Sequence, residues 1–138
     1  MSTVQNHRLV ITDFLARARD MFGDKQVIDH VDGTETLRYD YRTYADRVAR
    51  LASALVAAGV RPGDRVGTLA WNHHRHLELY LAVPLAGAVL HTINLRLEPD
   101  EIDYIVDHAE WMHRSHAAVV LHDNACTRAI SILNSIVN

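Results

Sequence analysis

The sequence predicts an α/β fold: a partial doubly wound, mostly parallel sheet preceded by an N-terminal β-hairpin. From Tyr44 onward, segments with apolar residues at helical spacing alternate with short apolar runs that suit buried strands. Before that point, the turn-forming pair Asp32-Gly33 separates two short β-type runs, which is the pattern of a hairpin. Strands that alternate with helices at this spacing indicate βαβ units with right-handed crossovers.

The first elements follow from local signals. A helix is predicted over residues 12–22, where Thr12 is expected to cap the amino end and Asp13 suits the positive end of the helix dipole. The hairpin strands are predicted over residues 26–31 and 36–39. Residues 44–55 then repeat apolar side chains every three or four positions, which predicts a second helix that ends at Gly59.

The βαβ pattern occupies the middle of the chain. The predicted elements are a strand over residues 65–71, a helix over 75–86, a strand over 88–93 and a helix that opens after Pro99 and turns Ile102, Ile105 and Val106 inward. The two strands are expected to pair in parallel, because one helix connects them. The residues expected to face the core from the helix over 75–86 are Leu77, Tyr80, Leu81 and Leu85.

The composition excludes several classes of protein. With 138 residues, 49% of them hydrophobic, and a net charge of −3, the chain is typical of a single globular domain without the basic excess that binds nucleic acid. Cys126 is the only cysteine, so no internal disulfide is expected. The longest uncharged apolar run, residues 79–90, is shorter than the roughly 20 residues needed to span a bilayer. We therefore expect a cytoplasmic protein without a transmembrane segment.

Residues 51–88 carry the most specific pattern. A helix ending at Gly59-Val60 leads into the turn Arg61-Pro62-Gly63-Asp64, a strand ends at Trp71-Asn72, and Glu78 precedes the run from Tyr80 to Ala88. With its flanks, over roughly residues 6–110, this pattern resembles the N-terminal part of the AMP-forming acyl-CoA synthetases, and is most similar to the medium- or long-chain fatty-acyl-CoA ligases. The resemblance implies the opening part of the large N-terminal domain of an adenylate-forming enzyme.

The resemblance also implies a reaction. The parent enzyme would use ATP, Mg²⁺ and coenzyme A to convert a carboxylic acid to an acyl-adenylate and then to an acyl-CoA. In that family, a later Gly-, Ser- and Thr-rich loop that ends in a lysine holds the ATP phosphates, and a second lysine comes from a mobile C-terminal domain. Lys25, the only lysine here, matches neither position. We therefore expect no catalytic, cofactor-binding or metal-binding residue in this chain and no activity of the chain alone.

The composition changes near Glu110. Sixteen of the seventeen acidic residues lie at or before it, and the residues that follow depart from the family pattern. We therefore divide the chain into the family segment, residues 1–110, and a divergent tail, residues 111–138, with a strand expected over 117–121 and a helix over 127–137. Truncation or a change of reading frame would explain this departure, and sequence divergence in a short natural protein is the alternative.

Other candidate sites give weak signals. The candidates are His73, His74 and His76, which lie close together; Glu110, His113 and His116, which have helical spacing; Ser53; and Cys126. Zinc requires three or four ligands that converge on one point, which this sequence does not enforce. We expect solvated histidines, a packed cysteine and no nucleophile at Ser53, which lacks a Gly-x-Ser-x-Gly elbow.

Two alternatives to an enzyme fragment stay open. A non-catalytic α/β module could bind a partner protein, or self-associate or bind a chaperone, through uncovered sheet and helix faces. A small ligand could bind where the strand over residues 65–71 ends, lined by Asn72 and His73. The structural interpretation of that segment is that Asn72 caps the following helix and Trp71 packs beneath it.

Overall fold

The structure is a computed structural model that describes residues 10–109 and 119–121. Its elements are α1 (Thr12–Phe22), β1 (Gln26–Val31), β2 (Thr34–Asp40), α2 (Tyr41–Ala57), β3 (Arg65–Leu69), α3 (His74–Leu85), β4 (Val89–Thr92), α4 (Pro99–His108) and β5 (Val119–Leu121). The predicted α/β class and element order are confirmed over these residues. The helix expected over residues 127–137 lies outside them.

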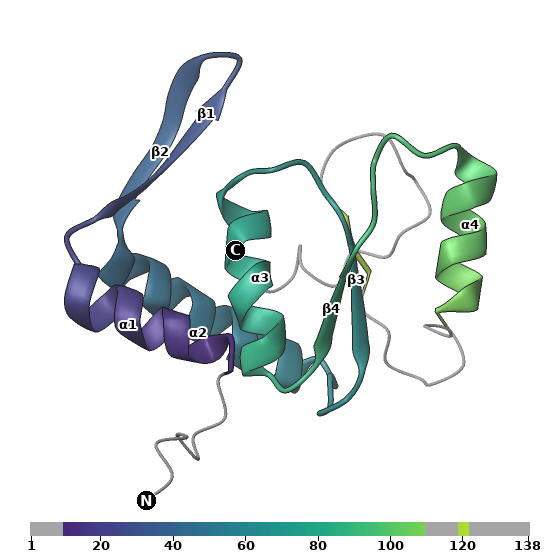
Figure 1. Ribbon diagram of the computed structural model, residues 1–138, viewed down its shortest axis with the longest axis horizontal. Coiled ribbons are helices and arrows are strands. Elements are labelled where there is room, and N and C mark those ends of the chain that lie inside the picture. Colours follow the sequence, from purple (N-terminus) through teal and green to yellow (C-terminus); the bar gives the residue numbers. More distant parts are fainter. Residues whose placement is uncertain (1–9, 110–118, 122–138) are drawn as a thin grey trace, which may run out of the picture.

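The parallel sheet has the strand order β4-β3-β5. Arg65 of β3 is aligned with Val89 of β4, and Gly67 with Val119 of β5, both in parallel. Because β4 and β5 lie on opposite sides of β3, right-handed crossovers require α3 and α4 to lie on opposite faces of the sheet. Figure 1 shows this arrangement, with the β3–β4 pair between the two helices. The predicted parallel pairing of the two central strands is confirmed.

The hairpin pairs β1 with β2 in antiparallel register, with Val27 opposite Tyr39 and Val31 opposite Thr34. Asp32 and Gly33 both have positive φ, 50° and 79°, as a tight two-residue hairpin turn requires. β2 begins two residues earlier than the sequence predicts, because the short turn lets pairing start at Thr34. In Figure 1 the tip of the hairpin points away from the helices.

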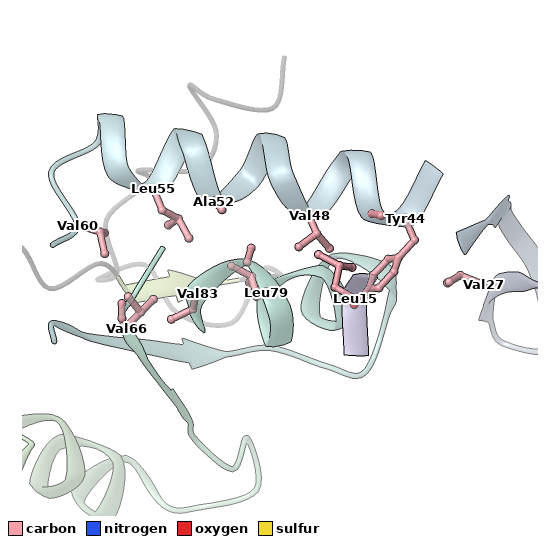
Figure 2. Packing of buried hydrophobic residues seen from close by; sticks show 13 residues of the cluster. Leu15, Val27, Tyr44, Val48, Ala52, Leu55, Val60, Val66, Leu79 and Val83 are labelled. Carbon is pink, nitrogen blue, oxygen red and sulfur yellow. The ribbon is translucent and has the colours of Figure 1, made fainter. Parts of the chain in front are cut away.

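The core lies between α2, α3 and β3, with α1 covering one end (Figure 2). Val48 and Leu55 from α2 meet Leu79 and Val83 from α3, and Val66 from β3 closes the cluster. These side chains are at most 2% exposed. Among the described residues, no helix is long and apolar enough to cross a bilayer.

The inner face of α3 differs from the prediction. Leu77, Tyr80 and Leu85 are 40–42% exposed, and only Leu81 of the expected stripe packs against the core. The residues buried on this helix are His76, Glu78, Leu79, Ala82 and Val83. Two stripes of apolar residues fit the helical period here. The stripe that contains two polar side chains is buried because those side chains find partners there.

One smaller expectation, the cap of α1, is also corrected. Thr12 does not cap α1, because the helical turn begins before it: Val10 and Ile11 carbonyls accept the Asp13 and Phe14 amides at 3.0 and 3.2 Å. On α4, Ile102, Ile105 and Val106 are half-buried while Glu101, Asp103 and Tyr104 are exposed, in agreement with the predicted inner face. The predicted bounds of the other described helices agree with the structure to within a few residues.

Candidate functional site

Five ionisable side chains meet where the base of the hairpin contacts α2 and α3. This polar cluster consists of Asp29 on β1, Tyr39 on β2, Arg47 on α2, and His74 and Glu78 on α3. It is the main concentration of paired, partly buried charge in the residues that the structure describes. We therefore treat it as the candidate site and ask what it does.

Local geometry explains how the cluster assembles. Side chains alternate between the two faces of a strand, so Val27 and Asp29 share the buried face of β1. Tyr39 lies directly opposite Val27 in the hairpin register, which places its ring on the same face. His74 and Glu78 are four residues apart and therefore lie one turn apart on the same side of α3.

Glu78 is the most deeply buried member, with its side chain 6% exposed. Its Oε1 accepts hydrogen bonds from Arg47 Nε at 2.6 Å and from the Tyr39 hydroxyl at 2.8 Å. The Arg47 guanidinium also lies 5.4 Å from the centre of the Tyr39 ring. Burial, followed by the bond to Glu78, raises the pKa of the Tyr39 hydroxyl, so Tyr39 stays a neutral donor.

The second pair joins β1 to the first turn of α3. The Nδ1 atom of His74 lies 2.6 Å from Oδ2 of Asp29, and the two side chains are 18% and 10% exposed. The hydrogen bond from His74 lowers the pKa of the Asp29 carboxyl, against the opposing effect of burial. The Tyr39 ring meets the His74 imidazole edge-on at 6.5 Å. Asp29 is therefore a carboxylate held by the imidazole.

The start of α3 corrects the expected roles of Trp71 and Asn72. The helix is capped by His73, whose Nδ1 accepts from the amides of Arg75 and His76 at 3.1 and 3.2 Å. Asn72 is exposed, and Trp71 is 54% exposed rather than packed beneath the helix. An imidazole can cap a helix only when one of its nitrogens is unprotonated and can accept a hydrogen bond. Asparagine accepts through its side-chain oxygen and is a preferred capping residue, so the sequence favoured Asn72.

His76 corrects the expectation of solvated histidines. It is 4% exposed, and its Nε2 lies 3.1 Å from the Thr68 hydroxyl on β3. Its ring packs 5.0 Å from the ring of Tyr80. Burial lowers the pKa of His76, because the charged imidazolium is poorly solvated there. His76 is therefore a neutral core histidine.

The remaining candidates do not converge on one point. His73, His74 and His76 are each engaged with a different partner, and residues 10–109 and 119–121 contain no group of three His, Cys, Asp or Glu that could hold a metal ion. Ser53 is exposed and donates to the Ala49 carbonyl at 3.0 Å within its own helix. Lys25 is exposed between α1 and β1. Glu110, His113, His116 and Cys126 lie outside the described residues.

The polar cluster holds four elements together: the two hairpin strands, α2 and α3. Each carboxylate already accepts from a neighbouring side chain, and the Tyr39 hydroxyl within the cluster donates to Glu78. Sequence reasoning missed the cluster because its members lie far apart in the chain, between Asp29 and Glu78. The one available signal was Glu78, a charge in an otherwise apolar stretch of α3.

A hairpin followed by a parallel βαβ unit with helices on both faces defines an α/β protein of the type found in the N-terminal domain of the adenylate-forming enzymes. The sequence profile described as "AMP-binding enzyme" matches residues 15–131. The chain therefore belongs to the AMP-binding enzyme family.

Individual relatives agree with this assignment. A long-chain-fatty-acid–CoA ligase from Thermus thermophilus is 50% identical over 109 residues, which are 79% of this chain and 20% of that protein. A medium-chain-fatty-acid–CoA ligase from Ectopseudomonas oleovorans is 39% identical over 110 residues, or 80% of this chain and 20% of that protein. The chain spans about a fifth of the length of these curated relatives.

A solved structure supports the same conclusion. The crystal structure of a protein described as a long-chain-fatty-acid CoA ligase from Rhodopseudomonas palustris superposes with a TM-score of 0.70 at 28% identity. The superposition covers 94% of this chain and 37% of that one. The resemblance to medium- and long-chain fatty-acyl-CoA ligases that the motifs indicate is confirmed.

Proposed function

We propose that this chain is the N-terminal part of a fatty-acid–CoA ligase. The observation that carries the proposal is the 50% identity over 109 residues to the long-chain ligase of Thermus thermophilus. The matched 109 residues make up 79% of this chain. A fatty acid is therefore the substrate class that we assign to the whole ligase.

The proposed reaction has two steps. A carboxylate oxygen of the acid attacks the α-phosphorus of ATP, which forms the acyl-adenylate and releases pyrophosphate. The sulfur of coenzyme A then attacks the acyl carbon, which forms the thioester and releases AMP. In the whole ligase, Mg²⁺ would neutralise phosphate charge during the first step.

We assign the residues of this chain a supporting role. A triphosphate needs a row of backbone amides or placed cations, and the sequence has one lysine and no Gly-rich loop of that kind. The polar cluster instead fixes the hairpin, α2 and α3 relative to one another. The 138-residue chain alone is expected to form no acyl-adenylate.

A segment exchange tests the proposal. The matching 109 residues of the Thermus thermophilus ligase would be replaced by those of this chain, and pyrophosphate release would be measured with long-, medium- and short-chain acids. We expect the chimera to retain fatty-acid-dependent activity. A chimera that folds, as judged by its thermal melt, but has lost activity on every acid would contradict the assignment.

Two measurements on the chain itself complete the test. The purified 138-residue chain is expected to release no pyrophosphate above a no-enzyme control when supplied with ATP, Mg²⁺, fatty acid and coenzyme A. Release in proportion to chain concentration would mean that this segment carries catalytic groups of its own. The control is the intact Thermus thermophilus ligase under the same conditions.

A non-catalytic interaction module is the second candidate, and one observation favours it. Several large apolar side chains are 40–54% exposed on α3 and the sheet ends, among them Trp71, Tyr80, Leu85 and Val89. Such surface promotes association. Sedimentation at micromolar concentration distinguishes the interaction module from the ligase segment. Dimers or larger species favour an interaction surface, and a monomer with a sharp thermal melt argues against it.

The division of the chain at Glu110 remains a proposal. The described strand β5 pairs with β3 and so belongs to the same sheet as the family segment. Limited proteolysis with mass spectrometry would test the division. Cleavage confined to residues after 121 would place the start of the tail beyond β5 rather than at Glu110.

A further inference from the structure

The β1–β2 hairpin has little apolar support of its own. On β1 only Val27 and Asp29 are buried, and on β2 only Leu37, Tyr39 and Asp40 are partly covered. The distal half is exposed on both faces, and Figure 1 shows it standing away from the helices. An isolated two-stranded hairpin is marginally stable in water, so its position depends on the contacts at its base.

The two ends of the hairpin are fixed to the helices. The Tyr41 amide donates to the Lys25 carbonyl at 2.8 Å, and the Lys25 amide donates to the Phe22 carbonyl at 2.8 Å. The Asp40 carboxylate caps α2 by accepting from the Thr43 amide at 2.7 Å. These bonds lie at the start of β1 and the end of β2, the two points where the hairpin joins the helices. They form a pivot there but do not fix the direction in which the hairpin extends.

The hairpin is held against α3 by side chains. Asp29 Oδ2 lies 2.6 Å from His74 Nδ1, and the Tyr39 hydroxyl donates to Glu78 at 2.8 Å. Among the described residues, Val27 is the one buried apolar side chain that β1 and β2 contribute to the core cluster. Glu78 also accepts from Arg47 of α2, and this bond between α2 and α3 involves no atom of the hairpin.

We propose that the β1–β2 hairpin is a hinged arm that closes on the first two turns of α3 through two side-chain pairs, Asp29 with His74 and Tyr39 with Glu78. Opening the arm uncovers that surface of α3 while α2, α3 and β3 stay packed. Local openings of this kind are expected where few apolar contacts and many exposed backbone hydrogen bonds coincide.

We call the two side-chain pairs, Asp29 with His74 and Tyr39 with Glu78, the latch, and the charged groups in contact with it come from the hairpin, α2 and α3. His74 is faced by Asp29 and Tyr39 from the hairpin and by its neighbour His73 at the start of α3. Arg47 of α2 contacts Glu78 and the Tyr39 ring. The lowered pKa of the Asp29 carboxyl agrees with a latch that requires the ionised carboxylate.

Residue-resolved hydrogen exchange of the 138-residue chain tests the proposal. Asp29→Asn removes the charge and Tyr39→Phe removes one hydroxyl. We expect the amides of β1 and β2 to exchange about tenfold faster in each variant, while the amides of α2 and β3 keep their wild-type rates. Arg38→Gln is the matched control, because Arg38 lies on the exposed face of the hairpin and its bonds to Glu35 and Gln26 stay within the hairpin.

The proposal is overturned if protection falls by the same factor in β1, α2 and β3, because the hairpin then opens only with the whole domain. It is also overturned if Arg38→Gln accelerates exchange as much as Asp29→Asn does. A double-mutant cycle with His74→Gln adds a second criterion: the effects of Asp29→Asn and His74→Gln on hairpin exchange should be less than additive. If the charge variant does not fold, the Tyr39→Phe comparison decides alone.

Discussion

Thr68 on β3 and His76 on α3 are joined across the core by a 3.1 Å contact between the threonine Oγ1 and the histidine Nε2. Both residues are at most 4% exposed. The contact gives a partner to the buried Thr68 hydroxyl and to Nε2 of the buried His76, and it ties the helix to the strand that precedes it. The pair also makes the domain sensitive to protonation.

Stability is therefore expected to fall as the pH drops below about 6.5, the ordinary pKa of an unfolded histidine. Burial lowers the pKa of His76, so the unfolded chain takes up a proton at a higher pH than the folded chain. The stability that neutral His76 contributes is fully present above the pKa of the unfolded histidine. It is lost as the pH falls from that pKa towards the lower pKa of His76 in the folded chain. Urea unfolding between pH 8 and pH 5 measures this slope.

His76→Phe is the matched variant for that measurement, because it keeps the ring and removes the titrating group. It should flatten the slope below pH 6.5. The Asp29 carboxyl acts in a separate, more acidic range: its lowered pKa means that its contribution is present above about 3.9 and is lost as the pH falls below that value. A slope between pH 8 and pH 5 that His76→Phe leaves unchanged would refute the assignment to His76.

The orientation of α3 leads to a second prediction. Leu79 is 2% exposed and Leu77 is 42% exposed on the same helix. Leu79→Ala should destabilise the domain by about 3 kcal/mol, because it leaves a cavity in the core. Leu77→Ala should cost less than about 1 kcal/mol. Equal losses for the two variants, measured by chemical denaturation, would mean that α3 buries the stripe that the sequence suggested.

How far the sequence could predict this structure depends on which side chains decide it. The hairpin and the parallel pair followed from signals within a few residues, such as Asp32-Gly33 and the mostly apolar run that follows Arg65. The buried face of α3 did not, because that helix has two apolar stripes. The choice between them depends on Thr68, Tyr39 and Arg47, which lie elsewhere in the chain.

The candidate site was unpredictable for the same reason. Asp29, Arg47 and Glu78 are separated by many residues and come from three elements, so no local spacing links them. His73 became the cap of α3 through its unprotonated Nδ1, which depends on tautomer rather than on residue type alone. The family assignment required neither the polar cluster nor the His73 cap. It depends on turn and strand motifs that can be recognised directly in the sequence.

The hairpin turn supports a third prediction. Gly33 has φ of +79°, in a region that side chains with a Cβ atom disfavour, and no neighbouring atom would contact an added methyl group. Gly33→Ala should therefore destabilise the hairpin by about 1 kcal/mol through backbone strain alone. Hydrogen exchange of the β1 and β2 amides should accelerate. Unchanged exchange in this variant would mean that the turn does not limit the stability of the hairpin.

The buried pair of Arg47 and Glu78 gives the last prediction, in which the two single variants should differ. The side chain of Glu78 is 6% exposed and that of Arg47 is 31% exposed. Arg47→Met leaves a carboxylate in the interior with only the Tyr39 hydroxyl to solvate it, which should cost about 3 kcal/mol. Glu78→Leu leaves the Arg47 guanidinium without its carboxylate, but this partly exposed group can turn towards water. The expected loss of stability is therefore smaller, about 2 kcal/mol.

The double variant separates charge from packing. Arg47→Met with Glu78→Leu removes both charges and places apolar side chains in their volume, so its loss should be smaller than that of Arg47→Met alone. Urea denaturation of the three variants at pH 7 measures these differences, with Arg38→Met as the control for an exposed cation. Additive losses would show that the two side chains act independently, and a larger loss for Glu78→Leu than for Arg47→Met would show that the interior tolerates the carboxylate without its cation.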